Sequence, residues 1–144
     1  METATMGKVL VTAKIENLAD LFSADQGLIP PAQVRSVEVS DALVDTGATG
    51  LSLPQRLISQ LGLKPLRTRR ARTSAGTVTV QVYGTVRLTI QGRECPTDVS
   101  EVPDECPVLV GQVPLEVLDF VVDPVSQRLI GNPAHGGEQM IELN

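Results

Sequence analysis

The stretch ALVDTGATG, residues 42–50, decides how the rest of the sequence is interpreted. Its apolar residues 42–44 predict a strand, and Asp45 follows at once on a tight turn that Gly47 permits. A strand that ends in a carboxylate on such a turn can present an acid in a cleft. The same Asp before Thr-Gly also fits an ordinary turn, in which the side chain hydrogen-bonds to its own backbone.

The composition predicts a mostly β protein with a single domain over residues 1–144. This length suits one core and is too short for two lobes. Aromatic residues make up 2% of the chain and Trp is absent, so Val, Leu and Ile must build the core. Val repeatedly alternates with polar residues, and ten Pro with twelve Gly indicate many turns.

The net charge of -5 and the pI near 4.8 argue against a nucleic-acid partner, because phosphate binding requires a basic face. The sequence nevertheless contains one cluster of basic residues, which consists of Arg67, Arg69, Arg70 and Arg72. A solvated strand face explains the cluster. The alternative is a rim that binds an acidic substrate.

The first residues carry no signal for export. Met1–Met6 lack both a charged n-region and an apolar h-region, and we expect residues 1–7 to be flexible. No apolar run approaches the roughly 20 residues of a membrane span, so we expect a cytoplasmic protein with no membrane partner. Cys95 and Cys106 are expected to be reduced, and with the lone His135 they make a poor metal site. No metal and no cofactor is predicted.

The alternation of hydrophobic residues and the positions of turn residues predict where the strands and helices lie. Strands are predicted at residues 8–15, 34–39, 42–44, 77–83, 85–91, 95–99, 107–111, 120–122, 128–130 and 140–143, and helices at residues 54–61 and 114–118. Residues 17–31 are predicted to form a loop with a short helical turn at 18–22. Gly84 is predicted to form a bend or bulge between two strands.

Residues Asp45–Ala48 resemble the Asp-Thr-Gly-Ala signature of the retroviral-type aspartic proteases, the retropepsins. An apolar-apolar-Gly element at Leu109–Gly111 follows in the order that this family has. Leu115–Glu116 and Val122–Pro124 look more like the cellular branch of the family than the viral one. The resemblance spans about Leu43 to Phe120, and it implies a single-lobe closed β-barrel with one or two short helices.

The resemblance also implies roles for the residues of the signature. Asp45 matches the catalytic aspartate, and Thr46 matches the residue whose hydroxyl bonds across a dimer to the partner loop. Gly47 matches the residue that passes close to the partner backbone, where a Cβ would intrude. Ala48 matches the small residue beside the substrate backbone.

A second set of roles falls on the segment between these two motifs. Residues 72–80 lie where the family has its flap, a hairpin that closes over the substrate, with its mobile tip at 74–76. The substrate-binding residues expected here are Thr73, Ser74, Ala75 and Gly76. Tyr83 lies beyond this tip, which favours a packing role for it over a flap tyrosine. Leu109–Gly111 match the strand that crosses beneath the active-site loop.

The presence of a single Asp-Thr-Gly motif implies a homodimer. Aspartic protease chemistry needs a water molecule between two carboxylates that share one proton, because like charges roughly 3 Å apart cannot both ionise. Asp-Thr-Gly occurs once in this chain. Each subunit would therefore supply its Asp45 to one site on a twofold axis. The function predicted is an aspartic endopeptidase that acts on a peptide or protein substrate.

Two other functions compete with this one. The glycines of residues 46–50 could suggest a dinucleotide-binding turn, but Leu53 stands where that turn needs a third Gly, and the βαβ alternation is missing. The serious alternative is a retropepsin-fold homodimer that binds or assembles with little proteolytic activity. His135 is interpreted as a solvated loop residue, since this chemistry needs no imidazole.

Overall fold

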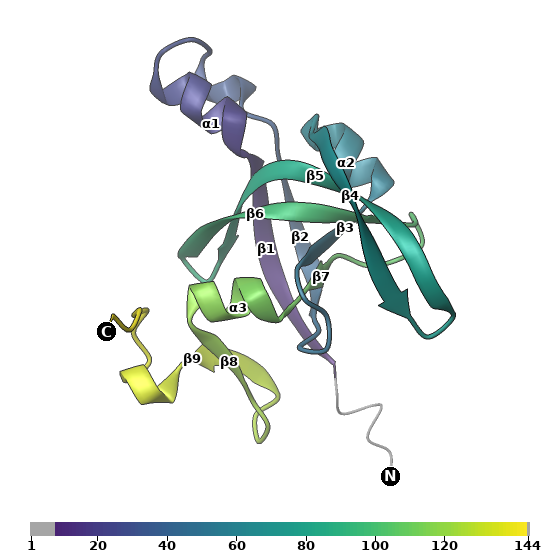
Figure 1. Cartoon of the computed structure of the whole chain (residues 1–144). Coiled ribbons are helices and arrows are strands. Elements are labelled where there is room, and N and C mark those ends of the chain that lie inside the picture. The colour runs from purple at the N-terminus through teal and green to yellow at the C-terminus, as the bar shows by residue number, and fades with distance from the viewer. Residues whose placement is uncertain (1–7, 144) are drawn as a thin grey trace.

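The computed structural model describes residues 8–143 and has a mostly β architecture, as predicted (Figure 1). The elements follow in the order β1 (Val9–Asn17), α1 (Leu18–Asp25), a 3₁₀ helix (Pro31–Gln33), β2 (Ser36–Val44), β3 (Leu51–Pro54), α2 (Gln55–Leu61), β4 (Lys64–Thr73), β5 (Gly76–Ile90), β6 (Arg93–Val102), β7 (Leu109–Val110), α3 (Gln112–Leu118), β8 (Phe120–Asp123), β9 (Arg128–Gly131) and a 3₁₀ helix (Pro133–His135). No helix among residues 8–143 is long and apolar enough to cross a membrane.

Six strands pair in a ring. The order of the seven-stranded sheet is β1-β2-β7-β3-β6-β5-β4, and β1 also pairs with β5, so that β4 extends outside the ring. Within β1, Val9, Val11, Ala13 and Ile15 are buried and alternate with exposed residues, as the sequence pattern predicts. The ring agrees with the predicted single-lobe fold, and its description as a closed barrel stays a prediction.

Two predicted strands, at residues 34–39 and 42–44, are one strand, β2. Val11 pairs with Ala42 and Ala13 pairs with Val39, so one residue of β1 lies opposite two residues of β2. This is a β-bulge, which adds a residue to one strand without ending the pairing. The polar pair Ser40–Asp41 therefore interrupts the apolar pattern but not the strand.

A second bulge joins the strands predicted at 77–83 and 85–91 into β5. Tyr83 pairs with Val99 and Val86 pairs with Thr97, so Gly84 and Thr85 lie opposite one residue of β6. The extra residue shifts the alternation by one position. The two valine-rich halves of β5 consequently face opposite sides of the sheet. Val86, Leu88 and Ile90 belong to the main core cluster, whereas the buried Val82 does not.

The described chain has three α-helices, one more than the one or two expected. The additional helix is α1, where only a short helical turn was expected. Asn17 caps it, with its side-chain oxygen accepting a hydrogen bond from the Asp20 backbone at 3.0 Å. Asp20 then binds the Arg35 guanidinium, Oδ2 to Nε at 2.8 Å, which ties the helix to the start of β2.

The other two helices lie where the sequence predicts them. In α2, Pro54 is the N-cap and Gly62 ends the helix in the left-handed conformation, with φ of 64°. The buried residues of α2 are Ile58 and Leu61. The buried face of α3 consists of Pro114, Leu115 and Leu118.

The predicted strand at 140–143 is wrong. These residues have no regular structure, and the Met140 backbone donates to Asp119 Oδ2 at 3.0 Å. Asp119 ends α3 in the left-handed conformation and is almost fully buried. The C-terminal segment therefore bonds to the Asp119 carboxylate, through the Met140 backbone and a neighbouring side chain, and not to another strand.

The interpretation of His135 as a solvated residue is also wrong. Its Nδ1 lies 2.6 Å from Asp119 Oδ2, its Nε2 lies 2.8 Å from Glu142 Oε2, and its side chain is 13% exposed. Because both partners are acceptors, both ring nitrogens make a hydrogen bond only when the imidazole is protonated. The carboxylates of Glu142 and Asp119 accordingly raise the pKa of His135, and His135 lowers the pKa of Asp119.

These shifts predict a pH-dependent contribution to stability. A raised His135 pKa stabilises the fold fully below the ordinary value of about 6.5, and that contribution is lost as pH rises through the folded-state pKa. The lowered Asp119 pKa acts in the opposite sense, with its contribution lost as pH falls below about 3.8. The Tm of the wild type should therefore be higher than the Tm of His135→Gln. This difference in Tm should be largest near pH 6 and smaller at pH 9. Parallel Tm curves from pH 5 to pH 9 would contradict this.

Candidate active site

The loop that carries Asp45 is held by β7 and by the segment that follows it. Asp45 N donates to Val110 O at 2.9 Å, and Gly111 N donates back to Gly50 O at 2.9 Å. Two further bonds, from Gln112 N to Ala48 O and from Val113 N to Thr49 O, are 2.9 Å each. Both ends of the loop are therefore bonded to residues 110–113, whereas its tip at Thr46 and Gly47 makes none of these bonds.

Inside the loop, the Asp45 carboxylate is oriented by the turn itself. Gly47 N donates to Asp45 Oδ1 at 3.0 Å, and Ala48 N donates to Asp45 O at 3.0 Å. A Cβ on Gly47 would lie 3.2 Å from Oδ1, so a larger residue would crowd the carboxylate. Asp45 is half-buried, while Thr46 and Gly47 are exposed. The turn thus has the self-bonded geometry of an ordinary Asp turn and still leaves the tip open.

Gly111 is the position where the loop and α3 come closest. A Cβ built there would lie 2.6 Å from Gly50 O, 2.6 Å from Thr49 C and 2.7 Å from Ala48 O. All three are backbone atoms, which cannot move aside as a flexible side chain can. This close approach explains why Gly ends the apolar-apolar-Gly element in the sequence.

Strand register separates a core row of side chains from an open row beside Asp45. The core row runs across five strands through Val44, Val110, Leu51, Val99 and Tyr83, which are paired in that order. The first four are 0–7% exposed. Residues paired across neighbouring strands share a face, so this row lies inside the ring.

The open row takes the alternate positions of the same strands. It runs through Leu43, Leu109, Ser52, Ser100 and Val82, again paired in that order. The first four are half-buried, in contrast to the core row. Asp45 follows Leu43 by two positions, so alternation directs its side chain to this open face. The open row therefore forms a surface beside the carboxylate, which we call the floor. It is apolar next to Asp45, at Leu43 and Leu109, and polar further away, at Ser52 and Ser100.

This part of the site could not be predicted in full from the sequence. The alternation of Leu43 with Val44, and of Leu109 with Val110, contains the signal for its first two members. Ser52 and Ser100 become members only through the parallel pairing of β3 with β6, which no local pattern reveals.

The hairpin of β4 and β5 lies where the flap is expected. Thr73 pairs with Gly76 across a two-residue turn of Ser74 and Ala75, and all four residues are exposed. Thr73 Oγ1 donates to Gly76 O at 2.9 Å and accepts from Ala75 N at 3.1 Å, so this side chain is engaged within the tip. The hairpin extends beyond the ring, and its tip lies on the side of the molecule where the β2–β3 loop lies (Figure 1). The substrate-binding roles of these residues stay predictions.

Tyr83 packs against the core, and its hydroxyl donates to Glu101 Oε1 at 2.9 Å. This bond to a carboxylate raises the pKa of Tyr83. The packing role predicted for it is confirmed. Cys95 is a buried free thiol whose pKa is raised by that burial, and Cys106 is a half-buried free thiol.

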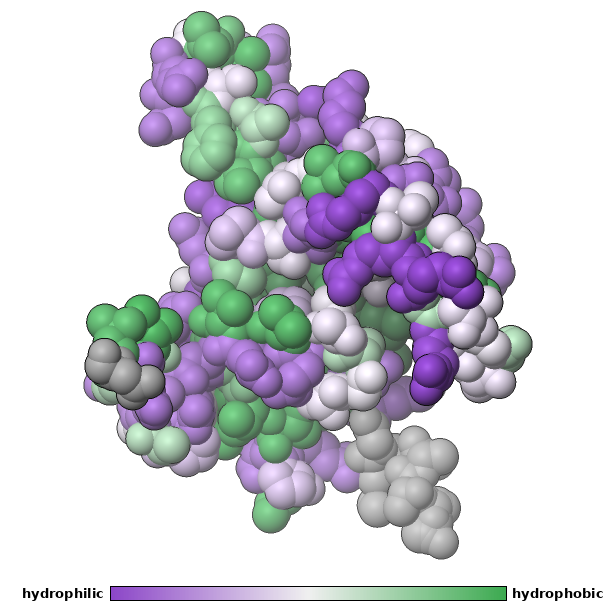
Figure 2. All heavy atoms as spheres, viewed as in Figure 1, coloured by the Kyte–Doolittle hydropathy of each residue, from purple (hydrophilic) through white to green (hydrophobic). Residues whose placement is uncertain are grey.

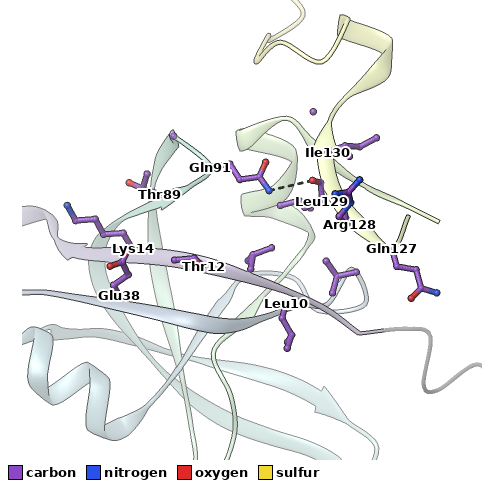
Figure 3. Close-up of a pocket in the computed structure, with 14 residues that line it drawn as sticks. Leu10, Thr12, Lys14, Glu38, Thr89, Gln91, Gln127, Arg128, Leu129 and Ile130 are labelled. Carbon is purple, nitrogen blue, oxygen red and sulfur yellow. Dashed lines mark hydrogen bonds between the residues drawn. The ribbon is translucent and has the colours of Figure 1, made fainter. Parts of the chain in front are cut away.

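A hollow of about 850 Å³ lies apart from Asp45, between β1 and β9 (Figure 3). Its wall includes Leu10, Thr12 and Lys14 of β1, and Gln91 reaches across to Leu129 O at 3.5 Å. None of Asp45–Ala48 lines this hollow. In the part of the chain that the structure describes, no three His, Cys, Asp or Glu side chains gather in a group that could hold a metal ion.

Comparison with known families agrees with the loop and the fold. The sequence profile described as Aspartyl protease matches residues 30–134, which include the Asp45 loop, the β4–β5 hairpin and α3. The chain therefore belongs to the aspartyl protease family, of the retropepsin-like kind. No curated protein sequence matches the chain.

The contact at Gly111 gives a test of how the loop is held. Gly111→Ala should lower the free energy of unfolding by about 2 kcal/mol, because the new methyl group meets backbone atoms on three sides. Gly50→Ala is the matched control: its Cβ would have no atom within 4 Å, so the change should stay within about 0.5 kcal/mol. Urea denaturation of both variants measures the difference. Equal effects at the two positions would contradict the packing described here.

Proposed function

We propose that this protein is an aspartic endopeptidase that works as a homodimer, with one Asp45 from each subunit in a shared site. The observation that carries the proposal is the Asp45 loop, whose carboxylate is oriented by Gly47 N while the tip residues Thr46 and Gly47 remain exposed. The aspartyl protease family needs two carboxylates, and the chain has one Asp-Thr-Gly. A second subunit that meets the exposed tip would complete the pair.

The chemistry follows from two carboxylates that share one proton. The unprotonated Asp45 takes a proton from the water between them, and the resulting hydroxide forms a bond to the carbonyl carbon of the substrate. The protonated Asp45 of the other subunit donates its proton to the carbonyl oxygen. The tetrahedral intermediate then collapses: the nitrogen takes the proton that the first Asp45 holds, the C–N bond breaks, and a hydroxyl of the intermediate returns a proton to the Asp45 of the other subunit. A carboxylic acid and an amine are released, and the pair again shares one proton.

The fixed loop supports this role through preorganisation. Four backbone bonds between residues 45–50 and 110–113 hold the carboxylate in place, so little reorganisation is needed during the reaction. The β4–β5 hairpin would act as the flap that covers the substrate and excludes water, with Thr73, Ser74, Ala75 and Gly76 at its tip. Leu43 and Leu109 would accept an apolar side chain next to the scissile bond, while Ala48 would lie beside the substrate backbone.

The first test compares the wild type with Asp45→Asn on a library of unstructured peptides from pH 4 to pH 7. Because Asn is nearly isosteric and can neither hold the shared proton nor act as a base, Asp45→Asn should lose at least about a thousandfold in cleavage rate. Product masses locate the bonds that are cut.

The control is the assembly state, measured by light scattering during size-exclusion chromatography for both proteins. Dimers of both with cleavage by the wild type alone support the proposal. Equal cleavage by both points to a contaminant, and a strictly monomeric active protein contradicts the shared site. Dimers of both with no cleavage at all would favour the binding or assembly module.

A further inference from the structure

The open row beside Asp45 continues onto the β4–β5 hairpin. Val82, its last member within the ring, pairs with Arg67. Beyond it, Val80 pairs with Arg69 and Val78 pairs with Ala71. Directly opposed residues of an antiparallel pair share a face, and successive pairs on one face are two residues apart. Arg67, Arg69 and Ala71 therefore lie on the face of the sheet to which Asp45 belongs.

Burial along the hairpin supports this assignment. Val82 is 2% exposed, Val80 is half-buried and Val78 is 42% exposed, so burial declines steadily from the ring toward the tip. In β4, Ala71 is half-buried while its neighbours Arg70 and Arg72 are exposed. The apolar, partly covered face of the hairpin is thus the one that continues from the ring's open row.

The four arginines of β4 divide between the two faces. Arg70 pairs with Thr79 and Arg72 with Thr77, which places both on the face opposite Asp45. Arg67 and Arg69 are on the Asp45 face. Strongly hydrophilic residues gather over β4 in the surface view (Figure 2). The basic cluster of the sequence is therefore two pairs with different surroundings.

The two arginines on the Asp45 face differ in their partners. Arg67 Nη2 donates to Asp98 Oδ2 at 2.8 Å, and both side chains are partly exposed. Asp98 therefore offsets the charge of Arg67. Arg69 forms no ion pair within residues 8–143. Its guanidinium is thus an uncompensated positive charge on a face whose members closer to Asp45 are leucine, serine and valine.

We propose that Arg69 is a specificity-determining residue that selects peptide substrates with an acidic side chain near the scissile bond. This inference rests on the proposed function, because it assigns the open row to substrate. An extended peptide placed across the row would put an apolar side chain on Leu43 and Leu109. A Glu or Asp side chain further along the same peptide would reach Arg69 on the hairpin that covers it.

The protein's net charge of -5 makes this selection depend on a local contact. A remote acidic peptide is repelled by the protein as a whole, so any preference for Glu must come from a positive group at short range. In the homodimer, each half of a bound peptide would meet one hairpin, and an acidic residue on either side of the scissile bond could use one Arg69.

The test uses matched peptides that differ only by Glu or Gln, placed in turn at each position within four residues of an apolar scissile bond. The wild type should favour Glu over Gln in kcat/KM by roughly fivefold at one position or more, the value of about 1 kcal/mol for a partly exposed ion pair. Arg69→Gln should bring that ratio to about one. Arg70→Gln, from the opposite face, should keep the wild-type ratio.

A second readout separates this inference from the proposed function. The same labelled peptides are titrated into Asp45→Asn, alone and combined with Arg69→Gln or Arg70→Gln, and binding is followed by fluorescence anisotropy. Glu-selective binding that only Arg69→Gln removes supports the inference, even when the wild type cleaves nothing and the proposed function fails. No Glu preference in cleavage or binding, or equal losses in Arg69→Gln and Arg70→Gln, would overturn it.

Discussion

The structure depends on the hydrogen bonds between the Asp45 loop and the segment that runs from the end of β7 into α3. Residues 45, 48, 49 and 50 each bond to residues 110–113 through the backbone, and Gly111 leaves no space for a Cβ between the two segments. These contacts join residues more than 60 positions apart along the chain. They place a carboxylate at the edge of a sheet whose core row is buried and whose open row is half-buried next to Asp45. One face of the sheet thus carries the buried core, and the other is the face on which the proposed substrate would bind.

Much of the fold could be predicted from the sequence where local chemistry determines it. Pro54 and Gly62 mark the ends of α2, and the alternation from Val9 to Ile15 marks β1, because caps and period-two patterns depend on near neighbours only. The Asp45 turn follows from the same kind of signal. The sequence failed where distant residues decide the outcome. The bulge in β2 requires the opposing β1, and α1 is stabilised by Arg35, 15 residues away from Asp20.

The candidate site was predicted in part for the same reason. Asp45, Thr46, Gly47 and Ala48 form one local turn, as expected. The floor beside them needs the register of five strands, and the bulge at Gly84 reverses which valines of β5 face the core. His135 shows the limit most clearly, because its partners Asp119 and Glu142 lie on two different segments and no motif connects the three. Alternation identifies a face within one strand, and only pairing relates the faces of different strands.

The central claim is that two Asp45 carboxylates, one from each subunit, act on one substrate. Mixing wild type with Asp45→Asn at a constant total concentration, with time for the subunits to exchange, tests this most directly. At an equal ratio about one quarter of the dimers carry two Asp45 residues, so activity should fall to about one quarter and follow the square of the wild-type fraction. A linear decrease, with about half of the activity at the equal ratio, would show that one Asp45 is enough and would contradict the account.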